Sequence, residues 1–197
     1  MRAVPSRWAL AAVFGAMLTS IFPQIAASQE GAVIERLMQD GLAARRRGDF
    51  ADATGHFEKA RDLAPRDTDV LLQLGLVYGF QERFKEAEAT LRRAADLVPE
   101  SAEITLALAR VMAWQGQYDA AAQLIDDILA RHPGDLDART FRSRIDLYRK
   151  QPAAAERGYR AILATDPDNV EALVGLGDAR AAQGDEAEAR TAWERAA

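Results

Sequence analysis

The chain has 197 residues, 28% of them charged, and a formal net charge of −5. That length is enough for one domain with a sizeable core, and without a basic excess nothing indicates a nucleic-acid-binding surface. The chain has no cysteine, which excludes disulfides, thiolate metal sites and thiol catalysis. Alanine, leucine, arginine, glutamate and aspartate dominate the composition, and this mix favours helices.

Residues 1–28 have the features of an export signal. Two arginines precede an apolar stretch that ends near Leu18, and small residues follow at 26–28. This order is typical of a secretory signal peptide, and the stretch is shorter than the roughly 20 residues that span a bilayer. We expect a signal peptide over 1–28, a short lead over 29–33 and a periplasmic mature chain. An uncleaved signal that anchors the chain in the membrane is the alternative.

A period of 34 residues runs through the rest of the chain. The prolines that mark it are Pro65, Pro99, Pro133 and Pro167. The alanines twelve positions earlier are Ala53, Ala87, Ala121 and Ala155, continued by Ala189. The small residues twenty-four positions earlier are Gly41, Gly75, Ala109 and Ser143, continued by Gly177. The large apolar residues eight positions earlier are Phe57, Leu91, Ile125 and Tyr159, continued by Trp193.

Each period predicts two antiparallel helices, A and B. Leu71, Leu74 and Tyr78 share one face of a helix A, and the proline ends each helix B. Gly75 and Ala87 are expected where the two helix axes approach most closely, because a larger side chain would force them apart. The predicted repeats are 34–67, 68–101, 102–135, 136–169 and 170–197, and the last one stops before its proline.

The second period contains the segment LLQLGLVYGFQERFKEAEATLRRAADLVP. It resembles the tetratricopeptide repeat, which is a helix–turn–helix motif of 34 residues. Its matching residues are Leu74, Gly75, Tyr78, Ala87, Leu91, Ala94 and Pro99. The resemblance covers residues 34–197. It implies an all-α solenoid of five repeats in a right-handed superhelix, with the last repeat truncated and with ligands bound along the concave surface of the A helices.

Polar residues at the start of the A helices predict how these helices begin. The predicted N-caps are Thr68, Ser101, Asp135 and Asn169. The acidic residues at the second position of the repeats are Glu35, Asp69, Glu103, Asp137 and Glu171. A carboxylate in the first turn is favoured by the helix dipole, and we prefer this interpretation to cation binding.

The family resemblance implies ligand contacts near positions 2, 5, 9, 12 and 13 of each repeat. Position 13 holds Phe80, Trp114 and Tyr148 in three consecutive repeats, and position 9 holds Arg110 and Arg144 in two of them. We predict that these five residues bind a ligand, with the aromatic residues forming a ladder. In the alternative, the aromatic residues pack over the neighbouring turn and the arginines are merely solvated.

Other features narrow the expected partners. Position 5 lacks the lysine with which some family members bind chaperone tails, and Tyr118 is expected to be structural. Helix A of the fourth repeat is locally basic, which indicates either a docking face or drift in a tolerant repeat. Its basic residues are Arg139, Arg142, Arg144, Arg149 and Lys150.

Catalysis finds little support in the sequence. His56 and His132 lie on different B helices, and no nucleophile elbow or phosphate-binding loop occurs. Acidic residues such as Glu86 and Glu88 are expected on solvated helix faces. We therefore predict a protein that is not an enzyme and that requires no cofactor or metal.

A second resemblance bears on cellular role. The segment LARVMAWQGQYDAA is similar to the N-terminal repeat region of the YaiO family of bacterial envelope proteins, in which repeats precede an outer-membrane domain. We expect a protein-binding or scaffolding module of the cell envelope, with a possible membrane-associated partner. The alternative is a carbohydrate-handling module of polysaccharide export. The last helix is expected to expose an apolar face that includes Trp193 and Ala196.

Overall fold

The computed structural model describes residues 29–197, which form two compact units divided between Val70 and Leu71. Throughout this part of the chain the regular secondary structure is helical, without strands, as the composition predicted. None of the helices in this part is both long enough and apolar enough to cross a membrane. The expected signal peptide at 1–28 lies outside the described residues.

The first unit contains the helix pair of the first repeat. Residues 29–46 are helical, so that the expected lead is part of this helix, and α2 spans Phe50–Leu63. Phe57 is fully buried, and a Cβ atom placed on Gly41 would lie 2.6 Å from its ring. The missing side chain of Gly41 therefore makes room for the buried ring of Phe57.

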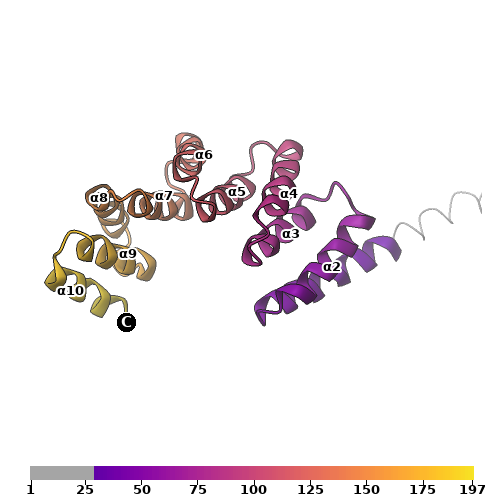
Figure 1. The fold of residues 1–197 in the computed structure, drawn as a ribbon, viewed down its shortest axis with the longest axis horizontal. Helices are drawn as coiled ribbons and strands as arrows, with labels where there is room; N and C mark the ends of the chain where they lie inside the picture. The colour runs from indigo at the N-terminus through magenta and orange to yellow at the C-terminus, as the bar shows by residue number, and fades with distance from the viewer. Residues whose placement is uncertain (1–28) are drawn as a thin grey trace, which may run out of the picture. The chain divides into compact units, whose positions relative to one another are not determined.

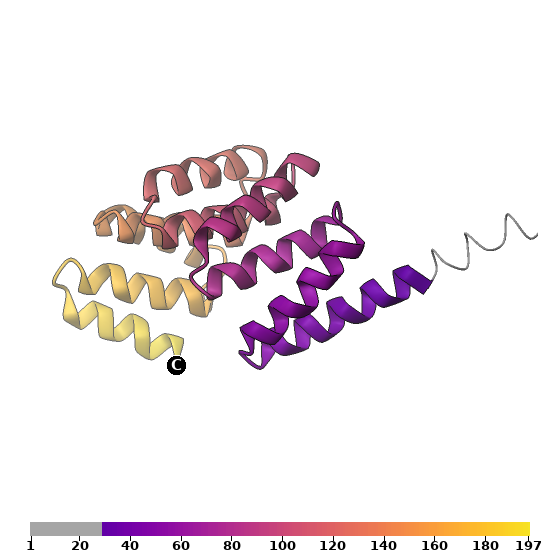
Figure 2. The same cartoon turned by 45° about the vertical axis from the view of Figure 1, so that its right-hand side comes forward.

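The second unit continues the alternation of A and B helices (Figures 1 and 2). From Thr68 onwards the chain forms α3 (Thr68–Phe80), α4 (Phe84–Leu97), α5 (Ala102–Trp114), α6 (Tyr118–Arg131), α7 (Leu136–Tyr148), α8 (Pro152–Leu163), α9 (Val170–Ala181) and α10 (Glu186–Ala196). Each helix from α4 to α10 packs against the next one, and α7 also packs against α9. The odd-numbered helices of this unit are the A helices.

In the first, second and fifth repeats a glycine on helix A faces a large residue on helix B. A Cβ atom on Gly75 would lie 2.5 Å from Cγ of Leu91, and one on Gly177 would lie 2.3 Å from Nε1 of Trp193. The facing residue is thus the large apolar one, eight positions before the proline, rather than Ala87. Ala87 is nevertheless fully buried, as are the equivalent alanines of the other repeats.

Each turn from helix A to helix B passes through one residue in the left-handed region. These residues occupy the same position of the repeat, and their φ angles are 78° at Gly48, 59° at Glu82, 77° at Gly116, 58° at Lys150 and 84° at Gly184. Glycine adopts this conformation without steric cost, whereas glutamate and lysine do not. The turn geometry is therefore the same in all five repeats even where the residue is unfavourable.

The predicted N-caps are confirmed at three of four positions. The side chains of Ser101, Asp135 and Asn169 each accept a hydrogen bond from the backbone N–H three residues later. The prediction for Thr68 is wrong, because Asp67 accepts the N–H of Val70 at 3.1 Å. Its carboxylate reaches the first turn, and Thr68 becomes the first residue of α3.

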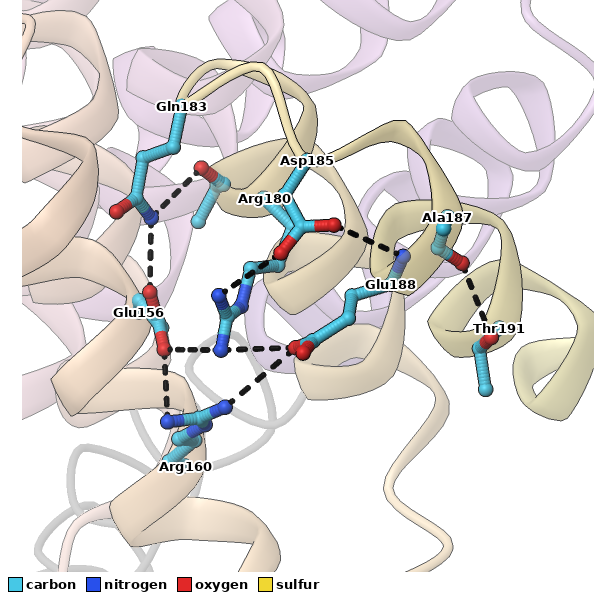
Figure 3. Close-up of polar contacts among 9 residues, drawn as sticks. Glu156, Arg160, Arg180, Gln183, Asp185, Ala187, Glu188 and Thr191 are labelled. Atoms are coloured by element: carbon cyan, nitrogen blue, oxygen red, sulfur yellow. Dashed lines mark hydrogen bonds and ion pairs between the residues drawn. The ribbon is translucent and has the colours of Figure 1, made fainter.

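Charged side chains join the last three helices (Figure 3). Glu156 on α8 is only 9% exposed, and its carboxylate contacts Arg160 at 2.8 Å and Arg180 at 2.9 Å. It also accepts a hydrogen bond from Gln183. Arg180 pairs in turn with Asp185 and Glu188. This network ties α10 to α8 and α9, while Trp193 at the expected apolar face stays 37% exposed.

Candidate functional site

The A helices α3, α5 and α7 enclose a cavity of about 250 Å³. The residues that line it are Leu76, Phe80, Arg110, Trp114, Phe141, Arg144 and Tyr148. All five predicted groove residues are in this set, because positions 9 and 13 of a helix A point to the same side in successive repeats. We call this cavity the aromatic pocket.

Trp114 packs against the neighbouring repeat and is also exposed at the aromatic pocket. Its ring centroid lies 5.6 Å from that of Phe80, and a Cβ atom on Gly79 would lie 2.6 Å from its Cζ3 atom. The indole thus packs on the end of α3 in the preceding repeat. It also remains 41% exposed, and Phe80 remains 47% exposed, so the pair presents apolar surface to the pocket.

Tyr148 belongs to a different aromatic pair. Its ring lies 5.5 Å from that of Tyr118, at the start of α6, and it is 44% exposed. Within the described part of the chain, no ring contact joins Tyr148 to Trp114. The predicted ladder is therefore two separate pairs on the walls of one pocket, and Tyr118 supports Tyr148.

Arg110 lies inside the pocket with its guanidinium 5.7 Å from the centroid of the Phe141 ring. It forms no ion pair with any residue that the structure describes. A cation over an aromatic face is stabilised by the ring quadrupole, but that contact leaves the charge available. Arg110 is thus a positive group that no carboxylate of the described chain neutralises.

Arg144 has partners within the protein. Its guanidinium forms an ion pair with Glu171 at the start of α9, so this member of the acidic row does more than favour the helix dipole. It also hydrogen-bonds the buried Tyr159, whose pKa burial raises to about 12 while Arg144 opposes that rise. Arg144 is therefore a fixed wall of the pocket rather than a free cation.

A second cavity, of about 310 Å³, continues the groove toward α9. It shares Arg144 and Tyr148 with the aromatic pocket, and its remaining lining residues are Leu147, Tyr159, Glu171, Val174, Gly175 and Asp178. Gly175 is required there, since a Cβ atom would lie 2.3 Å from the Tyr159 ring. We call this cavity the acidic pocket.

The basic residues in and just after α7 are largely engaged within the chain. Arg142 binds Asp126 and the buried Asp146, Arg149 binds Asp119, and Arg139 donates to the carbonyl of Ala161. The sequence left open whether these basic residues form a docking face. The basic residues join neighbouring helices, so this part of α7 is not an uncompensated docking face.

Sequence reasoning missed several members of the site and its support. Leu76 and Phe141 complete the aromatic pocket, and position 9 of the repeat was the signal that could have found Leu76. Glu88 was expected on a solvated face, but it accepts a hydrogen bond from Gln115 of the next repeat at 3.0 Å. The hydrogen bonds from Gln115 and Arg92 lower the pKa of Glu88 below its ordinary value. Glu88 therefore helps to hold the second and third repeats together.

The arrangement provides surfaces for binding rather than groups for bond-making. The aromatic pocket offers ring faces and a guanidinium, with no nucleophile and general base in hydrogen-bonding distance. In the described residues, histidines and carboxylates form no group of three or more that could hold a metal ion. A ligand in the groove would be held by burial of apolar surface and by charge.

Comparisons with known proteins agree with this fold. Models of the tetratricopeptide repeat match residues 44–96, 80–145 and 142–197. A crystal structure of MamA is 22% identical, with a TM-score of 0.63 over 84% of this chain and 91% of that one. MamA from Desulfovibrio magneticus is 16% identical, with a TM-score of 0.66 over 83% and 93%.

Among other solved structures, PilF from Pseudomonas aeruginosa is 18% identical, with a TM-score of 0.70 over 85% of this chain and 76% of that one. At these identities the similarity establishes the fold alone. No curated protein matches the sequence. Tetratricopeptide repeats generally mediate protein–protein interactions and generally act as non-catalytic scaffolds. The family models together cover most of the sequence, and the chain belongs to the tetratricopeptide repeat family.

Proposed function

We propose that this chain is a non-catalytic binding module of the bacterial cell envelope that holds a segment of a partner protein in its concave groove. The observation that carries the proposal is the convergence of Phe80, Trp114 and Tyr148, each 41–47% exposed, on one cavity beside Arg110. Partly exposed aromatic residues beside an arginine are the composition of binding hot spots. Covering their rings removes apolar surface from water, which favours association.

A photo-crosslinking experiment tests the groove. A benzophenone amino acid replaces Tyr148 in the full chain, expressed in cells, and a matched variant carries it at Gln123, an exposed residue of α6. The expected result is a covalent protein adduct at position 148 and none at position 123. Equal adducts at both positions, or none at 148, would contradict binding in the groove.

The envelope location is supported by the basic, apolar and small-residue order of residues 1–28. Expression of the full chain followed by cell fractionation tests it. N-terminal sequencing of periplasmic protein should begin just after residue 28. A chain that begins at Met1 in the membrane fraction would favour the anchored alternative, and a chain that begins at Met1 in the cytoplasm would contradict export.

The carbohydrate alternative rests on the exposed rings of Trp114 and Tyr148, since aromatic faces can stack on sugar rings. It predicts that purified protein binds immobilised envelope polysaccharide and that Trp114→Ala abolishes this binding. Polysaccharide binding that depends on Trp114, without a protein adduct at position 148, would replace the protein-partner proposal.

A further inference from the structure

The groove is not uniformly charged along its length. Position 9 of the A helices changes from apolar to cationic to acidic, in the order Leu76, Arg110, Arg144 and Asp178. The first three side chains line the aromatic pocket, and the last two line the acidic pocket. The two pockets are neighbours, because Arg144 and Tyr148 belong to both.

Internal pairing leaves one uncompensated charge in each pocket. Arg144 and Glu171 neutralise each other, so that Arg110 is the remaining charge of the aromatic pocket. Asp178 accepts a hydrogen bond from Nε1 of Trp193 at 3.2 Å and has no cationic partner in the described part of the chain. It is therefore the remaining charge of the acidic pocket.

The surroundings favour oppositely charged ligand groups at these two positions. The rings of Phe80, Trp114, Phe141 and Tyr148 displace water around Arg110, which strengthens its attraction to an anion. A carboxylate matches the planar guanidinium because it accepts two parallel hydrogen bonds. Asp178 lies beside Val174, so a lysine or arginine could pack its apolar stem there while its charge meets the carboxylate.

We infer that the partner segment is an extended peptide with an acidic side chain at Arg110 and a basic side chain at Asp178. This inference rests on the proposed function, since both charges lie in the proposed groove. Arg110 and Asp178 are two helix steps apart, because each shares a pocket with Arg144 on α7. At about 8–10 Å a step, as between packed helices, they span about 16–20 Å. An extended chain that rises about 3.3 Å per residue covers this span in five or six residues. The two charges therefore determine where along the groove the acidic and the basic side chain of the peptide lie.

The test is selection of random dodecapeptides displayed on phage against the full protein. Wild-type protein should enrich peptides with an acidic and a basic residue five or six positions apart. Arg110→Glu should exchange the acidic preference for a basic one, and Asp178→Lys should exchange the basic preference for an acidic one. Arg93→Glu, on the exposed face of α4, makes the same charge change as Arg110→Glu and should leave the selected pattern unaltered.

Two outcomes separate failure of the inference from failure of the proposed function. Selected peptides whose affinity falls about tenfold or more in Tyr148→Ala, but which show no charge pattern, would overturn the inference alone. A selection that yields no peptides sensitive to Tyr148→Ala would overturn both. Circular dichroism of each variant must match wild type, and Tyr148→Phe serves as the conservative variant that should retain binding.

Discussion

The second and third repeats and the fourth and fifth repeats share one backbone geometry but are held together by different chemistry. At position 11 of helix A, Tyr78 is 4% exposed and Met112 is 6% exposed. The same position holds Asp146, 8% exposed, and Arg180, both of which form ion pairs. The repeat thus preserves a buried site between helices without preserving the kind of side chain that fills it.

This difference has energetic consequences. Apolar burial is non-directional and nearly independent of salt, so the earlier repeats depend on volume and fit. A buried charge is stable only while its partners are present, so each member of the later network depends on the others. The Nε atom of Arg180 is buried without a hydrogen-bond partner, which shows that this network is not fully satisfied.

Removing one carboxylate from the ion-pair network of the fourth and fifth repeats should produce the largest change in stability. Glu156→Ala removes the acceptor shared by Arg160, Arg180 and Gln183, and we expect a loss of about 3 kcal/mol in the free energy of unfolding, because several hydrogen bonds to one nearly buried carboxylate are lost while Arg180 keeps only Asp185 and Glu188. Urea denaturation followed by circular dichroism and by tryptophan fluorescence measures it. The control is Glu86→Ala, which breaks an exposed pair with Arg83 and should cost less than about 1 kcal/mol. Equal costs would contradict the comparison.

Placing a larger side chain in the apolar core of the second and third repeats should have the next largest effect on stability. Ala87 is fully buried, so Ala87→Leu should destabilise the chain by roughly 1–3 kcal/mol through steric overlap. The loss should be the same at low and high salt. Glu86→Leu, at the adjacent exposed position, is the matched control. Thermal melts in which both variants resemble wild type would show that the helix register is wrong.

One hydrogen bond occurs in both halves and allows a direct comparison. Gln183 donates to Glu156 at 2.8 Å, and Gln115 donates to Glu88 at 3.0 Å from the same position of the repeat. Gln183→Ala should cost about 1.5 kcal/mol, as is usual for a hydrogen bond to a charged group. Gln115→Ala should cost less, because the side chain of Glu88 is 23% exposed against 12% for Glu156. Urea midpoints of the two variants measure this order, and the reverse order would contradict it.

The smallest expected effect is a pH dependence in the apolar half. The hydrogen bond from Gln115 and that from Arg92 lower the pKa of Glu88 in the folded chain. The stabilisation is therefore present above the unfolded pKa, about 4.3, and is lost as pH falls through the folded pKa. Glu88→Gln should cost less than about 1 kcal/mol at pH 7, and its cost should be smaller at pH 3. Urea midpoints at both pH values test it, and a constant difference would argue against linkage to Glu88.

The period predicted the helix pairs and the pocket because both depend on positions rather than on particular contacts. Phe80, Trp114 and Tyr148 recur every 34 residues, so in a regular solenoid they face the same side. The two ring pairs could not be predicted in this way. Tyr148 contacts Tyr118 through a side-chain orientation that the neighbouring helix determines, and periodicity contains no such information.

Two other misses have local or long-range causes. Asp67 and Thr68 are both able to cap α3, and only the backbone path decides which side chain reaches the N–H of Val70. Glu88 and Gln115 are 27 residues apart, in different repeats, so no window of one helix contains both. Polar contacts between repeats thus need the stacking geometry before they can be recognised.

The left-handed residue at every A–B turn also restricts how the sequence can diverge. One residue inserted or deleted at such a turn would rotate the next helix by about 100°, because an α-helix has 3.6 residues per turn. In the second repeat this rotation would carry Leu91 away from Gly75, which has room for it. Turns of identical length are therefore the condition for the stacked helix pairs of the second unit. The repeats can therefore diverge only by substitution. Tyr78 and Arg180, for example, occupy the same position of helix A in repeats of equal length.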